Sequence, residues 1–140
     1  MSMRLSNAAA SACAGDGSSA GLRAYIGTSN NYPVIKFYVG AVNTTPETAP
    51  AGTLLATLTA TAQFGAASNG AIADTSWTSA AAAASGTAGS WMLFKSDGTT
   101  PVADGSVAKT SGGDVNFDEN VFVSGGTVAL SSLTLTVPPH

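Results

Sequence analysis

The side chains able to perform nucleophilic or acid–base chemistry are few. The 140 residues include one histidine, His140 at the last position, and one cysteine, Cys13. A Ser/His/Asp or Cys/His catalytic arrangement, or a histidine-ligated metal, would therefore depend on a terminal residue that frays easily. A single cysteine provides neither an internal disulfide nor a cysteine-based metal site. We expect no enzyme activity, no catalytic residue and no metal or other cofactor.

Two aspartates, Asp97 and Asp104, are candidates for paired acid–base carboxylates or for Ca²⁺ ligands. Each directly precedes a glycine, however, and Asp-Gly is explained by turn geometry alone. The alternating acids and closing glutamate of an EF-hand loop are absent. We expect both aspartates in turns on either side of a short strand at Val102, and Asp118-Glu119 at the apex of a polar loop.

Aromatic side chains are the other candidates, because their faces can stack on sugars or pack against a partner protein. Trp77 stands among serines and threonines, and Tyr32 follows Asn30-Asn31 in a polar segment. Both are candidate interaction residues. Trp91 is a third, although core packing is the simpler interpretation of a tryptophan in an apolar strand. No nucleotide-binding or hydrolase motif of the G-x-G-x-x-G, G-K-[ST] or G-x-S-x-G kind is present.

The composition is poor in charge. Only 9% of the residues are charged, against roughly 25% in an average soluble domain. The net charge is −3 and the five basic residues form no cluster, so we expect no nucleic-acid binding. No apolar stretch approaches the ~20 residues of a membrane helix, and the N-terminal segment lacks the hydrophobic run of a signal peptide. Low charge suits either a subunit of an assembly or an extracellular β domain with a Ser/Thr surface.

The chain divides into an N-terminal arm, residues 1–21, and a single domain, residues 22–140. Ser6 or Asn7 could cap a short helix over Ala8–Ala14, which would need a neighbour to pack on. The following segment is rich in glycine and serine, as linkers are. We expect the arm to contact molecules outside its own fold, with Arg4 and Leu5 as interaction residues.

The rest of the chain alternates apolar and polar residues with a period of two. Seven or eight short strands with frequent turn signals predict an all-β fold, an antiparallel β-sandwich or barrel of jelly-roll-like type. We expect these strands at residues 22–27, 34–40, 53–64, 91–94, around 102, 115–117, 121–123 and 127–137.

Three details of this pattern can be tested. In the strand at 53–64, Leu54, Ala56 and Leu58 share one face and Leu55 lies on the other. In "VFV", Val121 and Val123 form the apolar set. The last strand changes phase between Leu130 and Leu133, which indicates a bulge or bend at Ser131–Ser132.

Five consecutive alanines, Ala80–Ala84, interrupt the β pattern. Alanine is the best helix former, but a five-residue helix is unfavourable in isolation and its apolar stripe would consist of methyl groups only. We expect the tract to be extended or irregular rather than helical, and in an extended tract the small side chains let another backbone approach closely. It leads into "SWMLF", in which Trp91 and Leu93 alternate with Met92 and Phe94. A strand apolar on both sides is central in a sandwich or presents one face to a partner.

Four segments carry a resemblance to a known family: "VIKFYVGAVNTTPETAPAGTLLATLT", "FGAASNG", "ASGTAGSWMLFKSDGTTPVADGSV" and "VALSSLTLTVP". In their order and spacing they resemble a family of small structural proteins encoded by tailed bacteriophages. The similarity covers roughly residues 3–14 and 34–138. The chain departs from the family pattern where "GDGSSAGLRAYIGTSNNYP" intervenes, and where the family has an arginine after its Trp-aromatic pair.

The resemblance implies a virion component without catalytic residues. We expect a capsid decoration, or cement, protein on the outer surface of the phage head, made in the bacterial cytoplasm. Its partners would be the major capsid protein and further copies of itself, with a trimer as the expected oligomer. The alternative is a tail- or fibre-associated module that contacts host glycans, through Trp77 and Tyr32, or other tail proteins.

Overall fold

The structure, a computed structural model, describes residues 4–7, 9, 26–27, 31–42, 45–48, 51–65, 71–109, 115–117, 120–130 and 133–136. Its bounded elements are all strands: β1 (Arg4–Leu5), β2 (Val34–Val39), β3 (Leu54–Thr59), β4 (Ala71–Asp74), β5 (Ala80–Ala81), β6 (Gly86–Phe94), β7 (Pro101–Lys109), β8 (Val115–Phe117), β9 (Val121–Phe122), β10 (Thr127–Val128) and β11 (Leu133–Thr136). The predicted all-β class is confirmed. No helix in the described part is long and apolar enough to span a membrane.

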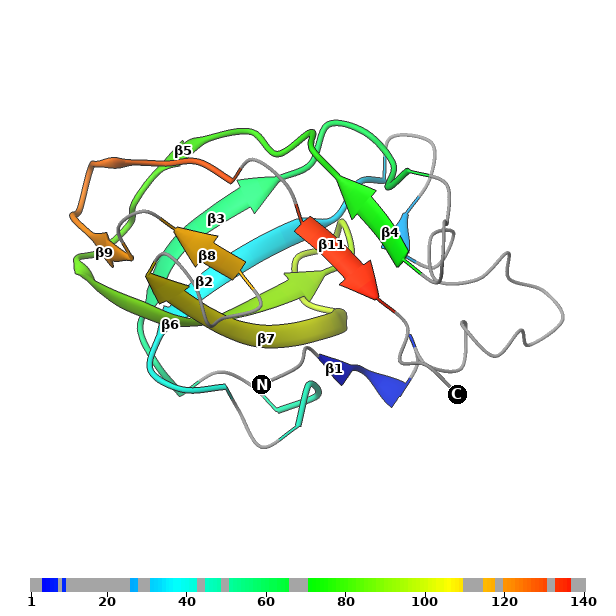
Figure 1. Ribbon diagram of the computed structural model, residues 1–140, viewed down its shortest axis with the longest axis horizontal. Coiled ribbons are helices and arrows are strands. Elements are labelled where there is room, and N and C mark those ends of the chain that lie inside the picture. Colours follow the sequence, from blue (N-terminus) through cyan, green and yellow to red (C-terminus); the bar gives the residue numbers. More distant parts are fainter. Residues whose placement is uncertain are drawn as a thin grey trace, which may run out of the picture.

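The largest sheet has the strand order β1-β7-β6-β2-β3, with β8 added to β7 and β9 to β6. Two small sheets, β4-β11 and β5-β10, complete the described strands. The pairs are antiparallel except for β7 with β8. In Figure 1, β11 crosses in front of the large sheet, and one core joins its buried Leu133 and Leu135 to the residues of that sheet. The fold is thus a sandwich of a large sheet and smaller ones.

The core depends on the register of the central strands. Phe37 of β2, Trp91 of β6 and Gly105 of β7 are ladder partners and share one face of the sheet. Trp91 and Phe37 are completely buried, and Phe37 meets Phe122 of β9 edge to face, with ring centroids 6.0 Å apart. Of the two alternatives for the apolar strand at 91–94, the structure shows the central position, because β6 lies between β2 and β7.

The other face of β6 forms a second, smaller cluster. Met92 and Phe94 are buried together with Tyr38 of β2, and burial raises the pKa of the Tyr38 phenol above its ordinary value. The Lys36 ammonium lies 5.0 Å from the centre of the Phe94 ring and donates a hydrogen bond of 2.9 Å to the carbonyl of Gly98. Both apolar faces of β6 are therefore buried within the chain itself.

The predicted faces of β3 are wrong at its first residues. The register between β2 and β3 shifts between Phe37 and Tyr38, so that Tyr38 pairs with Leu54. Leu55 is the extra residue of this bulge and is completely buried, whereas Leu54 is exposed. A bulge reverses the inward and outward positions that strict alternation predicts. From Ala56 onward the predicted phase holds, with Ala56 and Leu58 in the core.

The predicted apolar set of β9 is also reversed. Val121 and Val123 are 50% and 65% exposed, and Phe122 between them is buried. Phe122 is the larger side chain and meets Phe37 in the core, so burial of one aromatic ring decides the phase of the strand. Two valines on one face are left outside.

The predicted last strand is divided between two sheets. β10 pairs with β5 and β11 pairs with β4. Val128, Leu130, Leu133 and Leu135 are all buried, which explains why the apolar phase changes between Leu130 and Leu133. Ser131–Ser132, where we expected the bend, lie outside the described residues.

The alanine tract is not helical, as predicted: it begins in a strand and passes into a bend at Ala83 and Ala84. Ala80–Ala81 form β5. On one side the N–H of Ala83 donates to the carbonyl of Leu55 in β3, at 2.7 Å. On the other side Ala82 donates to the carbonyl of Gly126 and accepts from the N–H of Gly125. The tract therefore bridges β3 and the 125–128 segment, as its neighbours in Figure 1 show.

Several expectations fall outside the described residues. They concern most of the strand at 22–27, the loop at Asp118-Glu119, the unique Cys13 and His140, and most of the helix at 8–14. At the start of the predicted helix, the Ser6 hydroxyl accepts a hydrogen bond of 3.2 Å from the backbone N–H of Ala9. This is the contact that an N-cap serine makes.

Candidate interaction surface

Asp104 is not the turn residue that its Asp-Gly pair predicts. It lies in the middle of β7, is 1% exposed, and is the ladder partner of Arg4 in β1. Arg4 Nε donates to Asp104 Oδ1 at 2.9 Å and Nη2 donates to Oδ2 at 2.5 Å. The two residues are 100 positions apart, so no local pattern could reveal the pair. A bidentate guanidinium satisfies the buried carboxylate and makes a strand interior tolerable for it.

We call the N-terminal contact formed by Arg4, Leu5, Ser6 and Asn7 the clasp. Its backbone continues the ladder of β7, because the N–H of Ser6 donates to the carbonyl of Val102 at 2.8 Å. Leu5 is half-buried against the core, and Ser6 is buried. The N–H of Asn7 donates to Glu47 Oε1 at 2.5 Å. Arg4 and Leu5, predicted to contact a neighbouring molecule, thus contact their own chain in this structure.

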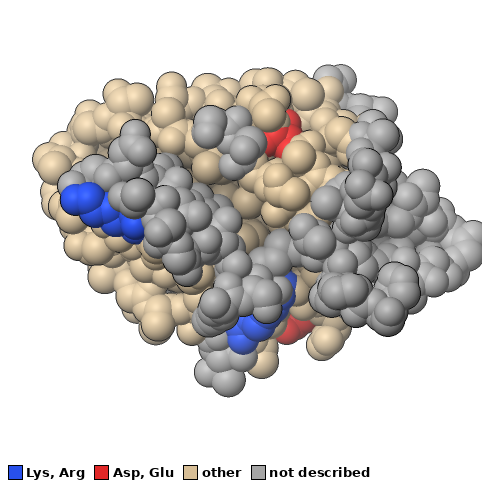
Figure 2. All heavy atoms as spheres, in the orientation of Figure 1, with Lys and Arg blue, Asp and Glu red and all other residues tan. Residues whose placement is uncertain are grey.

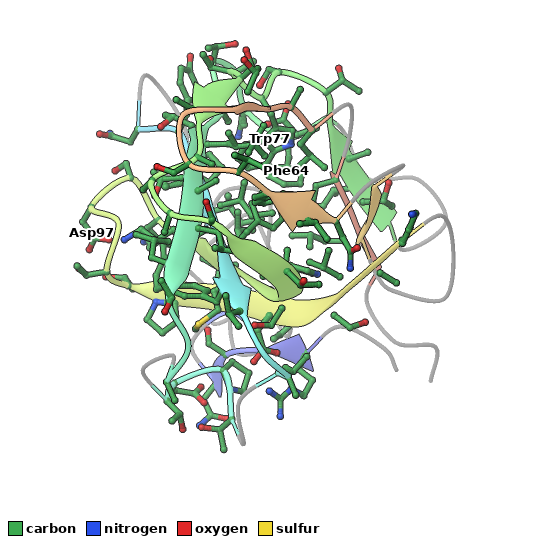
Figure 3. The ribbon with its side chains drawn as sticks, turned by 90° about the vertical axis from the view of Figure 1, so that its left-hand side faces the viewer. Phe64, Trp77 and Asp97 are labelled. Carbon is green, nitrogen blue, oxygen red and sulfur yellow. The ribbon has the colours of Figure 1, made fainter. Side chains whose placement is uncertain are left out.

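Asp97 does occupy a turn, as predicted. Its Oδ1 accepts the N–H groups of Thr99 and Thr100, each at 2.9 Å, and its Oδ2 accepts the Thr100 hydroxyl. These hydrogen bonds, led by that of the Thr100 side chain, lower the pKa of Asp97 to about 2. Gly98 follows with φ +73°, the left-handed conformation that glycine adopts without strain. Figure 3 shows Asp97 at the outer end of the β6–β7 hairpin.

The candidate tryptophans lie inside the fold. Trp77 is 8% exposed and meets Phe64 edge to face, with ring centroids 6.2 Å apart. Figure 3 labels the two residues next to each other. Its backbone forms an isolated bridge with Ala60 at the end of β3. The Nε1 atoms of Trp77 and Trp91 have no hydrogen-bond partner among the described residues. Both indoles act through packing, and neither offers a face for stacking on a sugar.

Tyr32 lies at the boundary between the surface and the core. Its side chain is partly buried and packs against the main cluster, while its neighbour Asn31 is exposed. The structure does not bring Tyr32 and Trp77 together at an exposed groove, because the Trp77 ring is covered. Of the five predicted interaction residues, Arg4 and Leu5 share one contact and the three aromatic ones pack into the fold.

The most exposed large apolar side chains of the described residues are Val121 and Val123, which we call the valine tip. Three backbone N–H groups donate hydrogen bonds in the turn that follows it: Ser124 to the Ser85 hydroxyl at 2.9 Å, Gly125 to the Ala82 carbonyl at 2.9 Å, and Gly126 to the Val123 carbonyl at 2.7 Å. The tip is therefore a fixed shape. The period-two pattern of the sequence did not predict the valine tip, because it predicts that Val121 and Val123 face the core.

The described surface offers little for charge-based chemistry. Figure 2 shows charged side chains at only a few separate places on one face of the molecule. Within the described ranges no three His, Cys, Asp or Glu side chains gather as a metal site would require. Asp74, which is buried, accepts the N–H of Ser76 through Oδ1 at 2.8 Å. The arrangement suits packing against another surface better than a reaction.

Comparison with protein-family models, with curated proteins and with solved structures finds no match to this chain.

Proposed function

We propose that this protein is a non-enzymatic structural subunit of a bacteriophage virion, a decoration protein that binds the outer surface of the major capsid protein lattice. The observation that carries the proposal is the valine tip, two largely exposed valines followed by a hydrogen-bonded turn on a chain with 9% charged residues. A charge-poor surface with fixed apolar contacts is typical of a protein that is buried in an assembly.

Such a subunit would act by mass action. A protein that binds only the assembled lattice stabilises that state in proportion to its free concentration and its affinity. A rigid tip loses little conformational entropy on binding, so most of the free energy from burying its valines contributes to affinity. No catalytic group is required for this role.

The resemblance of the sequence to small phage structural proteins supports a virion location. Association with the tail is the alternative within the same class. The glycan-binding form of that alternative relied on an accessible Trp77, and the Trp77 ring is covered by the fold.

The proposal is tested on intact particles. We expect the protein to co-purify with full phage heads, and we expect heads that lack it to release their DNA at a lower temperature. Recovery of the protein only with isolated tails would favour the alternative. Its absence from particles of either kind would refute a virion role.

A matched pair of variants tests the valine tip itself. V121S/V123S removes apolar surface without touching the core, and we expect at least tenfold weaker binding to heads that lack the protein. The control is A73S, an exposed position in β4 at the opposite end of the molecule from β9 (Figure 1). Equal binding by both variants would show that the tip is not the contact.

A further inference from the structure

The outer edge of β7 is closed by two different strands. β8 pairs with Val107–Lys109, and β1 pairs with Ala103 and Asp104. β1 has only two residues, too few for a strand to be stable through its backbone hydrogen bonds alone. Side-chain contacts must therefore hold this part of the edge closed.

The β7 edge also cannot be left open at low cost. Without residue 4, the Asp104 carboxylate would lose its ion pair while buried, and without residue 6 the Val102 carbonyl would lose the N–H of Ser6. An unpaired buried charge and a free strand edge are both strongly unfavourable. The edge is thus an acceptor site built for residues 4–7 of this chain, which are followed by the completely buried Ala9.

Nothing in these contacts requires that donor and acceptor belong to the same molecule. The N-terminal segment is separated from the next described residue, Ile26, by residues 10–25. That stretch includes "GDGSSAG", and when fully extended it would span on the order of 50 Å. A second copy offers the same arginine, leucine and serine to the same edge, with identical contacts.

We propose that the clasp is exchangeable, so that the β1 strand of one copy closes the β7 edge of a second copy of this chain. Within one molecule the tether keeps β1 at an effective concentration in the millimolar range. Intramolecular closure is therefore expected in dilute solution, and exchange where copies are crowded. This inference does not rest on the proposed function, since it needs only a second copy at high local concentration.

Charge reversal tests the exchange directly. In R4D two acidic side chains face each other at positions 4 and 104, and in D104R two basic side chains do. Each variant therefore repels its own β1 strand from its own β7 edge. In a mixture, the acidic arm of R4D fits the basic edge of D104R, and the unchanged arm of D104R fits the unchanged edge of R4D. We expect native mass spectrometry to show a 1:1 complex in the mixture, and monomers of each variant alone. The double variant R4D/D104R serves as control and is expected to be a monomer with restored thermal stability.

If either single variant is insoluble, the two are refolded together. Recovery of soluble protein only from the joint refolding would support exchange. A mixture that stays as separate or insoluble chains, while R4D/D104R folds, would overturn it.

A second measurement is independent of the charges. Leu5 and Ala103 are ladder partners, close enough for a disulfide. In a C13S background, L5C and A103C are mixed under oxidising conditions at about 1 mM, the scale of the tether's effective concentration. We expect an interchain L5C–A103C disulfide, identified by peptide mapping. If only the L5C/A103C double variant forms the bond, within its own chain, the exchange proposal is wrong.

Discussion

Two Asp-Gly pairs seven residues apart end in opposite environments. Asp97-Gly98 forms an exposed turn in which the carboxylate accepts hydrogen bonds from Thr99 and Thr100. Asp104-Gly105 lies in the interior of β7, with Asp104 1% exposed and bound to Arg4. The first carboxylate is satisfied by residues two and three positions further on, and the second by a residue 100 positions away.

The difference shows how far a local signal extends. Asp-Gly favours a turn because its own backbone can satisfy the carboxylate and glycine accepts a positive φ. Gly98 has φ +73°, whereas Gly105 is not among the described glycines with positive φ. Gly105 instead faces Trp91 across the ladder, where a residue without a side chain stands beside the largest residue of the sheet. Sheet pairing overrides the turn preference at the second site.

Among the substitutions that test this comparison, we expect Arg4→Met to have the largest effect. It leaves the buried Asp104 carboxylate without its bidentate partner, and we expect a loss of about 3 kcal/mol in the free energy of unfolding. Arg4→Lys retains the charge but not the fork geometry, and we expect a smaller loss. Urea denaturation of the three proteins measures both. Equal stability of wild type and Arg4→Met would mean that the Arg4–Asp104 pair does not stabilise the isolated molecule.

The next test makes the same substitution at both sites. Asp104→Asn removes a buried charge-assisted pair, and we expect a loss of about 1–3 kcal/mol. Asp97→Asn changes an exposed side chain, and we expect only a small fraction of that effect. Thermal melting at pH 7 compares them. Similar losses for the two variants would show that burial does not distinguish the two aspartates.

Glycine at the turn provides a smaller test. Gly98→Ala forces a Cβ into a left-handed conformation, at φ +73°, and we expect a loss of about 1 kcal/mol. Gly98→Asn should lose less, because asparagine tolerates this region better. A lower melting temperature for Gly98→Ala than for Gly98→Asn would support the left-handed conformation of Gly98. An alanine variant as stable as wild type would contradict it.

The smallest expected effect concerns pH. Hydrogen bonds hold the pKa of Asp97 at about 2, below its ordinary value of 3.8. The ionised carboxylate therefore stabilises the folded state above about pH 4, and this contribution is lost as the pH falls towards 2. We expect the difference in melting temperature between wild type and Asp97→Asn to shrink from pH 5 to pH 2. A difference that grows on acidification would contradict the sign.

Some features of the fold can be predicted from the sequence and others cannot. The non-helical alanine tract follows from the short length of the run and its polar neighbours. The change of phase between Leu130 and Leu133 predicts a bulge or bend within one strand, whereas the residues on its two sides pair in different sheets. Leu54 and Leu55 could not be assigned, because a bulge opposite Phe37/Tyr38 is a property of the paired strands. Val121 and Val123 could not be assigned either, because Phe122 takes the inner position only through contact with Phe37.

By itself, the sequence determined the all-β class, the apolar character of both faces of the strand at 91–94 and the turn at Asp97, because period-two alternation and turn chemistry act over a few residues. The tertiary structure alone decided that Arg4 meets Asp104, that Trp77 is covered, and that two valines remain outside. Each of these depends on which distant strands are paired and in which register. Register is set by the free energy of burying the whole core, which no short segment contains.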